Sequence, residues 1–384
     1  MNRKFWCAAA AALAAAGMLA ALFYFRVRHD MEDFAVNEKA ARRMSVGETL
    51  YRAGDEHWQF KYMPAAALLY MPLTSLDRTA ALAVWFLVVA GSCAGLVLVS
   101  RRLLPPSRRT GFWITLIPPL ILLRFFLREI ELGQINALVT LLLLLAVHQL
   151  VRAEQDRPAA HDIAAGILWG TAIALKPYSA ILLPWLIIKG RWRSLLAGLG
   201  VTAAAVLAPV LYYGWRGNLV VHGEWLSTLS RSTPRLFTSQ DNISLAGFLS
   251  KWTGGAPIAL LLAAGIGALA LLFLAMIFRG RRMPRSAGLE GAVLLTMTPL
   301  VSPLGWDYTF LMATAGIMFL VAFFDDFPRP ARWILGVNFG IIALSLYDIL
   351  GRSAYAAFMR LSIPTLCFLL IAAALARLRF RAAA

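Results

Sequence analysis

The chain has 384 residues, of which 60% are hydrophobic and 15% are charged, and its mean hydropathy is +0.69. Soluble domains are about 45 to 50% apolar and about 25% charged, so this composition excludes soluble enzymes and nucleic-acid-binding proteins and indicates a chain that crosses a bilayer many times. The 37 Lys and Arg residues outnumber the 20 Asp and Glu residues, which gives a formal net charge of +17. In a polytopic membrane protein this excess first indicates basic cytoplasmic loops, so charge alone identifies no ligand.

The first apolar stretch, residues 5–25, follows Arg3 and Lys4 and shows no small-residue cleavage site. A signal-peptide core is about 7 to 15 residues long whereas a span needs about 20, so the stretch predicts an uncleaved first helix that starts inside. Further apolar runs bring the prediction to about twelve crossings. These runs fall near residues 79–99, 111–127, 134–150, 162–175, 178–188, 194–213, 256–278, 287–301, 309–324, 333–349 and 358–376.

Short basic turns orient these spans through the positive-inside rule. The turns expected in the cytoplasm carry Arg101, Arg102, Arg108 and Arg109, then Lys189, Arg191 and Arg193, then Arg279, Arg281, Arg282 and Arg285, and finally Arg377, Arg379 and Arg381. Both termini are therefore predicted to be cytoplasmic, and the polar loops at about 26–62 and 214–255 to lie outside the cell membrane. No repeat or linker marks a second domain, so residues 1–384 are expected to form one all-α, polytopic membrane domain.

Two stretches depart from this simple pattern of spans. The segments on either side of Lys176-Pro177 are each too short to cross, so they form either a helical hairpin or one broken span, and basic residues at both ends favour the hairpin. The run 63–76 is also short and contains Pro64 and Pro72. We expect an interfacial or re-entrant helix there beside an outer cavity, because irregular backbone at membrane depth needs protein or water to satisfy it.

Function is expected on the outer side, because ionisable residues near membrane depth are costly and usually line a pathway or a site. The first outer loop carries the carboxylates Asp30, Glu32, Asp33 and Glu38. One of them could act as a general base that takes a proton from an acceptor hydroxyl. The alternative is a solvated acidic stretch that is balanced by Lys39, Arg42 and Arg43.

Arg124 and Arg128 lie one helical turn apart and can share a face of a helix. Two guanidiniums on one face suit a lipid-borne phosphate, because arginine binds phosphate oxygens through a bidentate fork. An internal network in which Glu129 and Glu131 neutralise the arginines explains the spacing equally well. Lys176 ends an apolar helix, so its ammonium needs either an anionic partner or a route to the interface by snorkelling.

Two further segments have side chains that suit a sugar. Asn242 lies in Asp241-Asn242-Ile243-Ser244, and Trp306 and Asp307 lie in Gly305-Trp306-Asp307-Tyr308. An aromatic face covers the apolar side of a pyranose, while amide and carboxylate groups bind its hydroxyls. Tryptophan is also the ordinary residue of the interfacial belt, which is the alternative for this side chain.

No metal or cofactor is expected. The five histidines have no metal-ligand spacing, no glycine loop suits a phosphate of ATP, and the isolated Cys7, Cys93 and Cys367 suggest neither a disulfide nor a zinc site.

Taken in order, several short motifs resemble glycosyltransferase family 87, which comprises membrane-embedded enzymes of the GT-C type and includes polyprenyl-phosphate-mannose-dependent mannosyltransferases. The motifs are Asp33-Phe34 with Ala40-Ala41, Gly47 and Tyr51; Phe60, Tyr62, Pro64 and Pro72; Gly133-Gln134-Ile135-Asn136; Lys176-Pro177-Tyr178; Asn242, Ser244-Leu245 and Gly247; and Ser302-Pro303 with Trp306-Asp307. They extend over most of the chain. The resemblance departs at Tyr308-Thr309, where relatives often carry histidine.

The resemblance implies an enzyme that transfers a sugar, with mannose expected, from a polyprenyl phosphate to a hydroxyl of a lipid or glycan acceptor. It implies Asp33 as the catalytic base of an inverting displacement, and a phosphate leaving group needs no second carboxylate as acid. The cations Arg124, Arg128 and Lys176 are expected to stabilise the departing phosphate. The residues expected to contact sugar or acceptor are Gln134, Asn136, Asn242, Trp306 and Asp307.

Two other functions are compatible with the same features. A carrier or flippase for a lipid-linked substrate shares the spans and buried charges, but transporter folds often show paired broken helices in two halves, and here the broken segments fall in the first half. A GT-C transferase with a different sugar donor is the other alternative. The sequence names neither the donor sugar nor the acceptor.

Overall fold

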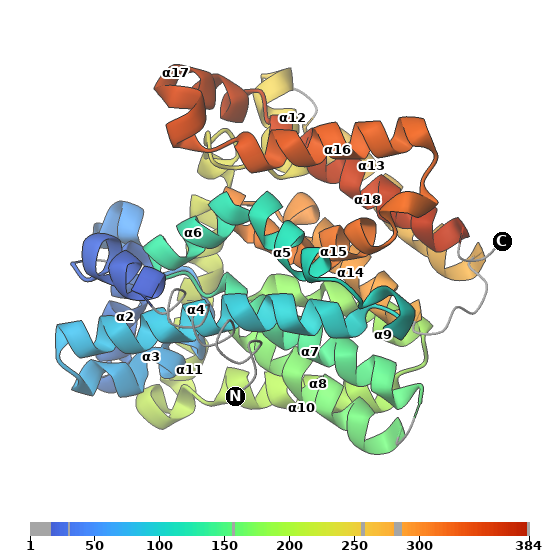
Figure 1. The fold of residues 1–384 in the computed structure, drawn as a ribbon. Helices are drawn as coiled ribbons and strands as arrows, with labels where there is room; N and C mark the ends of the chain where they lie inside the picture. Colours follow the sequence, from blue (N-terminus) through green and yellow to red (C-terminus); the bar gives the residue numbers. More distant parts are fainter. Residues whose placement is uncertain (1–16, 30, 156–157, 255–257, 280–285, 382–384) are drawn as a thin grey trace, which may run out of the picture.

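The computed structural model describes residues 17–29, 31–155, 158–254, 258–279 and 286–381 (Figure 1). Within these ranges the chain is built from helices and contains no β-strand, which confirms the predicted all-α class. The main helices are α2 (Glu32–Ser45), α3 (Ala66–Tyr70), α4 (Arg78–Leu103), α5 (Phe112–Ile121), α6 (Leu123–Leu132), α7 (Asn136–Ala153), α8 (Pro158–Leu175), α9 (Leu182–Ile188), α10 (Trp192–Leu207), α11 (Val210–Ser232), α12 (Leu245–Thr253), α13 (Ile258–Arg279), α14 (Ser286–Val301), α15 (Thr314–Ala322), α16 (Arg329–Leu344), α17 (Tyr347–Arg360) and α18 (Ile363–Arg381). Shorter helical segments are η1 (Phe23–Val27), η2 (Ala53–Trp58), η3 (Met71–Ser75), η4 (Pro106–Arg108), η5 (Pro177–Ile181), η6 (Pro234–Leu236), η7 (Asp307–Ala313) and η8 (Phe324–Asp326).

Membrane-length helices are present, although fewer than the sequence suggests. Among the described residues, α4, α7 and the part of α18 up to residue 380 are long and apolar enough to cross a bilayer. Two further pairs pass the same test only together and are sharply bent, by 91° between α10 and α11 and by 100° between α16 and α17. Other apolar helices are shorter, so the count of about twelve crossings stays a prediction.

Two expectations for the first part of the chain have different outcomes. Most of the predicted first span, residues 5–25, lies outside the described residues, and its end is a helix over Gly17–Val27. The run 63–76 forms the short helix α3, which continues into η3, and both pack against α2. The predicted short helix is therefore present, and its depth in the membrane stays a prediction.

The chain reverses its direction between α8 and α9. Trp169 Nε1, in α8, donates a hydrogen bond of 2.9 Å to the backbone oxygen of Ser179 in η5. Arg191, which follows α9, lies 3.4 Å from Asp162 near the start of α8. The chain thus returns along the whole length of α8, which is the geometry of the predicted hairpin and excludes a single broken span.

Small residues let α8 and α10 approach each other closely. A Cβ added to Gly166 would lie 2.3 Å from the backbone oxygen of Ser194, and one added to Gly170 would lie 2.4 Å from that of Gly198. Glycines four residues apart bring helix backbones together in membranes, where close packing takes the place of water exclusion as the attraction between helices.

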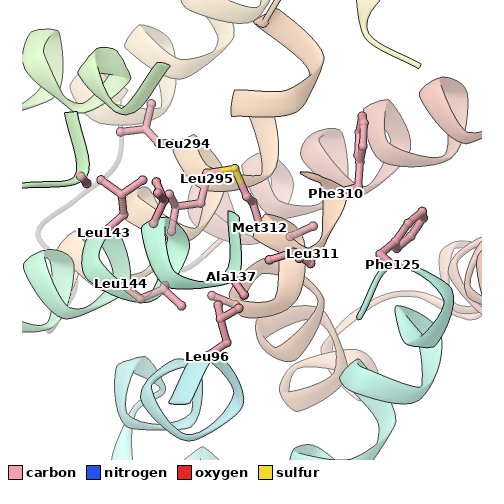
Figure 2. Packing of buried hydrophobic residues seen from close by; sticks show 14 of the residues in the cluster. Leu96, Phe125, Ala137, Leu143, Leu144, Leu294, Leu295, Phe310, Leu311 and Met312 are labelled. Carbon is pink, nitrogen blue, oxygen red and sulfur yellow. The ribbon is translucent and has the colours of Figure 1, made fainter. Parts of the chain in front are cut away.

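The apolar core lies where α4, α6, α7, α14 and η7 meet (Figure 2). The side chains labelled there are Leu96, Phe125, Ala137, Leu143, Leu144, Leu294, Leu295, Phe310, Leu311 and Met312, all of which are buried. Because η7 follows α14 into this core, the segment that carries Asp307 is anchored against the start of α7 and against α6.

A second buried cluster lies at the far end of α14. Glu290 is fully buried and accepts a hydrogen bond of 3.0 Å from Trp185 Nε1. Lys189 Nζ lies 2.8 Å from Glu290 Oε2, and Arg379 Nη2 lies 3.1 Å from Glu290 Oε1. Two basic turns that were predicted to be cytoplasmic therefore meet at one end of the molecule. The start of α7 and the end of α14 lie toward the opposite end.

Candidate active site

Asp33 lies in the first turn of α2, where close packing brings it to the junction of α6 and α7. Gly133, which ends α6, has a φ of 67°, a left-handed conformation that favours glycine. A Cβ on Gly133 would lie 2.9 Å from the Cβ of Met31 and 3.0 Å from that of Phe34. The glycine therefore permits both the turn and the contact with α2, and the next residue, Gln134, comes to lie beside Asp33.

Several charges of the first outer loop pair with one another around Glu38 and Asp55, and none of these pairs includes Asp33. Lys39 and Arg43 pair with Asp55, whereas Arg42 and Arg78 pair with Glu38. Lys39, Arg42 and Arg43 therefore neutralise carboxylates of this loop, as the alternative required, but these carboxylates are the buried side chains of Glu38 and Asp55 and not a solvated stretch. Asp30 lies outside the described residues, and Glu32 is exposed.

Asp33 is a half-buried residue whose carboxyl group is influenced by several charged residues. Burial raises the pKa of Asp33 above its usual range, while hydrogen bonding from Gln134 and the positive charges of Lys176 and Arg128 oppose the rise. The negative charge of Glu32 raises the pKa further. A carboxylate with a raised pKa holds a proton more strongly, so this environment makes Asp33 a better base.

Gln134 and Asn136 form the centre of a buried hydrogen-bond network. Gln134 Nε2 donates to Tyr308 Oη at 3.0 Å, and Gln134 Oε1 accepts from Tyr62 Oη at 3.3 Å and from Asn136 Nδ2 at 3.2 Å. Tyr178 Oη donates to Asn136 Oδ1 at 3.1 Å. The two residues that were predicted to bind sugar or acceptor therefore link several segments of the chain behind Asp33.

Glu129 also belongs to this network, and it caps the start of α7. Its Oε1 accepts the backbone N–H of Ala137 at 2.6 Å, and its Oε2 accepts Asn136 Nδ2 at 2.9 Å. The first N–H groups of a helix have no partner within the helix, so a carboxylate at this place satisfies them and stabilises the helix dipole. Glu131 instead pairs with Arg26 at 3.3 Å.

Lys176 lies at the end of α8 between two aromatic rings. Its Nζ is 4.6 Å from the ring centre of Tyr62 and 5.8 Å from that of Tyr178. Within the part of the chain that the structure describes, no carboxylate forms an ion pair with it at 4.0 Å or less, although the negative charges of Glu129 and Asp33 act on it. The ammonium is held by cation–π contacts and can accept an anionic ligand.

The two predicted phosphate-binding arginines differ in their environment. Arg124 is buried, and its Nη2 lies 3.0 Å from Asp307 Oδ2. Its Nη1 donates to both the backbone oxygen and the hydroxyl of Ser345, each at 2.9 Å. Arg124 therefore connects α6 with η7 and with the break between α16 and α17.

Arg128 is less tightly held, because 43% of its side chain is exposed and its two carboxylate neighbours are 3.5 Å away. These neighbours are Asp241 and Asp307, and the buried Nε lies 3.5 Å from Asp307 Oδ1 without a hydrogen bond among the described residues. The alternative network, in which Glu129 and Glu131 neutralise the arginines, is wrong because the neutralising carboxylates come from distant parts of the chain.

Asn242 joins two loops and uses its whole side chain to do so. It is fully buried, and its Oδ1 accepts the backbone N–H groups of Ser244 at 3.2 Å and Gly305 at 3.0 Å. Its Nδ2 donates to the backbone oxygen of Pro303 at 3.3 Å. An isolated β-bridge pairs its backbone with that of Trp306, whose side chain is half-buried. This arrangement places Trp306 and Asp307 opposite Arg128.

Three residues around Asp33 had no predicted role. Lys61 is partly buried, and burial lowers its pKa while the charge of Asp33 opposes this change. Tyr62 and Tyr308 both bond to Gln134, as described above. The sequence signal for Lys61 and Tyr62 was their place in the aromatic segment before Pro64. For Tyr308 the signal was its position directly after Asp307.

Among the described residues, no three His, Cys, Asp or Glu side chains are grouped as they would be around a metal ion. The expectation of a metal-independent enzyme stays a prediction.

The family model of glycosyltransferase family 87 matches residues 60–303, which is more than half of the chain. The match includes Arg124, Arg128, Gln134 and Lys176, whereas Asp33 precedes it. A search of curated proteins finds no match.

A solved structure with a similar arrangement is the crystal structure of ArnT from Cupriavidus metallidurans bound to undecaprenyl phosphate. The sequence identity is 16% and the TM-score is 0.48, and the similarity covers 100% of this chain and 77% of that chain. The family match confirms the resemblance found in the sequence and removes the support for a carrier without chemistry. The chain belongs to glycosyltransferase family 87 and is a membrane glycosyltransferase.

Proposed function

We propose that this glycosyltransferase moves a sugar, with mannose as the first candidate, from a polyprenyl phosphate to a hydroxyl group of a lipid or glycan acceptor. The observation that carries the proposal is the environment of Asp33. It is a half-buried carboxylate without an ion-pair partner among the described residues, and the positive charges of Lys176 and Arg128 act on it. A base and two cations on one site are what the displacement of a phosphate by a hydroxyl requires.

The reaction is a direct displacement at the anomeric carbon of the donor. Asp33 takes the proton of the acceptor hydroxyl, and the acceptor oxygen forms a bond to the anomeric carbon. The bond from that carbon to the phosphate oxygen breaks, and its electron pair leaves with the polyprenyl phosphate. A single displacement inverts the anomeric configuration, and a phosphate leaves without protonation, so one carboxylate suffices.

In this proposal, Lys176, Arg128 and Arg124 have different roles toward the phosphate. Lys176 has no committed carboxylate, and Arg128 has only long contacts, so both can bind phosphate oxygens. Arg124 is engaged by Asp307 and Ser345, which suits a role in holding Asp307 in front of Arg128.

We assign the sugar contacts according to how much of each side chain is exposed and how many of its polar atoms already bond to the protein. Trp306 is half-buried and can present part of its indole face to a pyranose. Asp307 and Asn136 border the site, although their polar atoms already have protein partners. Asn242 has every polar side-chain atom bonded to the protein, so it suits a support of the Trp306 segment.

The site is proposed to lie on the extracytoplasmic side of the cell membrane, with both termini cytoplasmic. The basic turns around Lys189 and Arg379 lie at the opposite end of the helices, and such turns are retained in the cytoplasm. We further propose that residues 1–384 act as one membrane domain and that the transfer needs neither a cofactor nor a metal.

The experiment is transfer of radiolabelled mannose from polyprenyl-phosphate mannose to endogenous lipids in membranes that contain the wild type or Asp33→Asn. We expect label with the wild type and a loss on the order of 10²- to 10⁴-fold with the variant, which is the usual contribution of a general base. Nuclear magnetic resonance of the product gives its anomeric configuration and tests inversion.

Glu32→Gln is the matched control, because Glu32 is the adjacent exposed carboxylate of the same helix turn. It should retain transfer. An active Asp33→Asn enzyme would remove Asp33 as the base. If the wild type transfers no mannose, a panel of other polyprenyl-phosphate sugars separates a different donor from the absence of this activity.

A further inference from the structure

Lys176 occupies the point where α8 stops and the chain turns back. Its backbone is extended, with φ of −144° and ψ of 109°, because the ring of Pro177 keeps the preceding residue out of the helical conformation. The helix α8 therefore ends at Leu175, and η5 begins at Pro177 and contains Tyr178. The motif Lys176-Pro177-Tyr178 thus brings a cation and an aromatic ring to the same turn.

Two tyrosine rings from different parts of the chain contact the ammonium of Lys176. Its Nζ lies 4.6 Å from the ring centre of Tyr62, in the first outer loop, and 5.8 Å from that of Tyr178. Both distances are within the range of about 6 Å over which a ring face attracts a cation. A ring has no net charge, so, unlike a carboxylate, it attracts the ammonium without neutralising it. The full positive charge therefore remains available to an anion.

The hydroxyl group of each ring is hydrogen-bonded to a buried amide. Tyr62 Oη donates to Gln134 Oε1 at 3.3 Å, and Tyr178 Oη donates to Asn136 Oδ1 at 3.1 Å. The two amides are bonded to each other, from Asn136 Nδ2 to Gln134 Oε1 at 3.2 Å. A phenol hydroxyl both donates and accepts, so both tyrosine contacts persist whichever way the amides are turned. One pair of amides thus fixes both rings.

Gln134 and Asn136 are poorly placed to bind a sugar themselves. Gln134 is 2% exposed and Asn136 is 0% exposed. Gln134 Nε2 also donates to Tyr308 Oη at 3.0 Å, and Asn136 Nδ2 also donates to Glu129 Oε2 at 2.9 Å. A ligand would have to break these bonds to reach the amides. The two tyrosine rings are half-buried and therefore more accessible than the amides that hold them.

We propose that Tyr62 and Tyr178 are positioning residues that hold the ammonium of Lys176 in place for the donor phosphate. Gln134 and Asn136 in turn fix the two rings. A free lysine side chain loses much rotational freedom when it binds a ligand, and a side chain that is already held loses less. The rings therefore raise the affinity for phosphate without touching it.

This inference rests on the proposed function, because it takes Lys176 as a ligand of the phosphate. For Gln134 and Asn136 it replaces the direct contact with sugar or acceptor that the sequence suggested.

The test is equilibrium binding of a radiolabelled polyprenyl phosphate to the full chain in detergent, with the matching polyprenol as a ligand that lacks the phosphate. Tyr62→Leu removes the ring face, and we expect the Kd for polyprenyl phosphate to rise about 2- to 30-fold, the range that a cation–π contact covers. Tyr62→Phe keeps the ring and loses only the bond to Gln134, so its effect should be smaller. The affinity for polyprenol should be unchanged in both variants.

A double-mutant cycle with Lys176→Met separates positioning from direct contact. If Tyr62 acts through Lys176, Tyr62→Leu weakens binding in the wild type and has no further effect in the Lys176→Met protein. Losses that add, or an equal loss of affinity for polyprenol, would show that the ring touches the lipid and would overturn the positioning role. Tyr178→Leu is measured in the same cycle and should show a smaller loss, because its ring lies farther from Nζ.

Tyr213→Leu is the matched control. Tyr213 also donates its hydroxyl to the first outer loop, to the backbone oxygen of Glu48 at 2.8 Å, but Lys176 is not among its described partners. This variant should bind polyprenyl phosphate as the wild type does. The comparison separates the loss of a ring beside the cation from a general loosening of the loop.

Binding does not require transfer, so the outcomes for this inference and for the proposed function are distinct. A weakened Lys176→Met protein beside an unchanged Tyr62→Leu protein would overturn the positioning role and leave the proposed function intact. An unchanged Kd in Lys176→Met would instead remove Lys176 from the phosphate site, and with it both roles. If Tyr62→Leu does not fold, the same cycle with Tyr178→Leu decides between positioning and direct contact.

Discussion

At the scale of single residues, some charged side chains near the site are paired within the fold, whereas others can still bind a ligand or accept a proton. Glu38 and Asp55 are neutralised by basic neighbours, and Glu129 caps α7, so none of these carboxylates is available as a base. Asp33 is the exception among the carboxylates near Gln134. Likewise Arg124 is paired with Asp307, whereas Lys176 has cation–π contacts and no ion pair among the described residues.

The raised pKa of Asp33 predicts the pH dependence of transfer. The base works only when it is ionised, so kcat/KM should fall as the pH drops through a midpoint above the ordinary aspartate value of about 3.9. Lys176→Met removes a positive charge and should move this limb to higher pH. Glu32→Gln removes a negative charge and should move it to lower pH. Limbs that coincide in all three enzymes would contradict Asp33 as the titrating group.

The two arginines should respond differently to substitution. Arg128→Gln should leave the protein folded and raise the donor KM, because its contacts to Asp241 and Asp307 are long and partly exposed. Arg124→Gln leaves the buried Asp307 without its close partner, which for buried pairs costs about 3 to 5 kcal/mol. Thermal unfolding in detergent and donor kinetics measure both effects. Equal losses of stability would refute this division.

At the scale of elements, helix ends and close crossings place the site residues. The hairpin of α8 and α9 carries Lys176 at its tip, and α10 supports the hairpin through glycine contacts. The turn at Gly133 connects α6 to α7 and sets Gln134 beside α2. Regular helices alone would not bring these side chains together, so the breaks between them are the functional parts of the fold.

Gly170→Ala should destabilise the hairpin, because the added Cβ would lie 2.4 Å from the backbone oxygen of Gly198. The helices must move apart, and lost packing of this kind costs typically 1 to 3 kcal/mol. Gly200→Ala is the matched control on α10, since nothing lies within 4 Å of its Cβ. It should be neutral or slightly stabilising, because alanine favours a helix over glycine. The midpoint of thermal unfolding in detergent distinguishes the two.

At the scale of the whole molecule, the polar site and the basic turns lie at opposite ends of the helices. Asp33, Lys176 and Trp306 belong to segments that were predicted to be outside, and Lys189 and Arg379 belong to turns that were predicted to be inside. The helix-packing pattern agrees with this separation, because α7 begins at the site and ends near Arg191.

Labelling of single cysteines should show this orientation in intact cells, in a variant that lacks the native cysteines. Ser75→Cys lies in the exposed η3 segment and should react with a membrane-impermeant maleimide from outside. Gln155→Cys lies just after α7 and should react only after permeabilisation. Labelling of position 155 in intact cells would reverse the proposed topology.

The sequence by itself determined the class of protein and its family, and it supplied most residues of the proposed site. Composition alone indicates a helical membrane protein, because a bilayer allows few backbone structures and requires apolar side chains around them. Short motifs led to the family and to Asp33, and basic residues at both ends led to the hairpin. These features are local in the chain, so they can be seen without knowing which segments meet.

Only the tertiary structure decided how the charges are distributed among partners. Arg124 meets Asp307, which is 183 residues away, and no spacing rule relates the two positions. The adjacent Glu129 was the obvious local partner, yet it caps α7 instead. A charge in a membrane protein pairs with whatever the packed helices bring within about 4 Å, since unpaired burial is costly. The availability of Asp33, Lys176 and Arg128 is therefore a property of the fold.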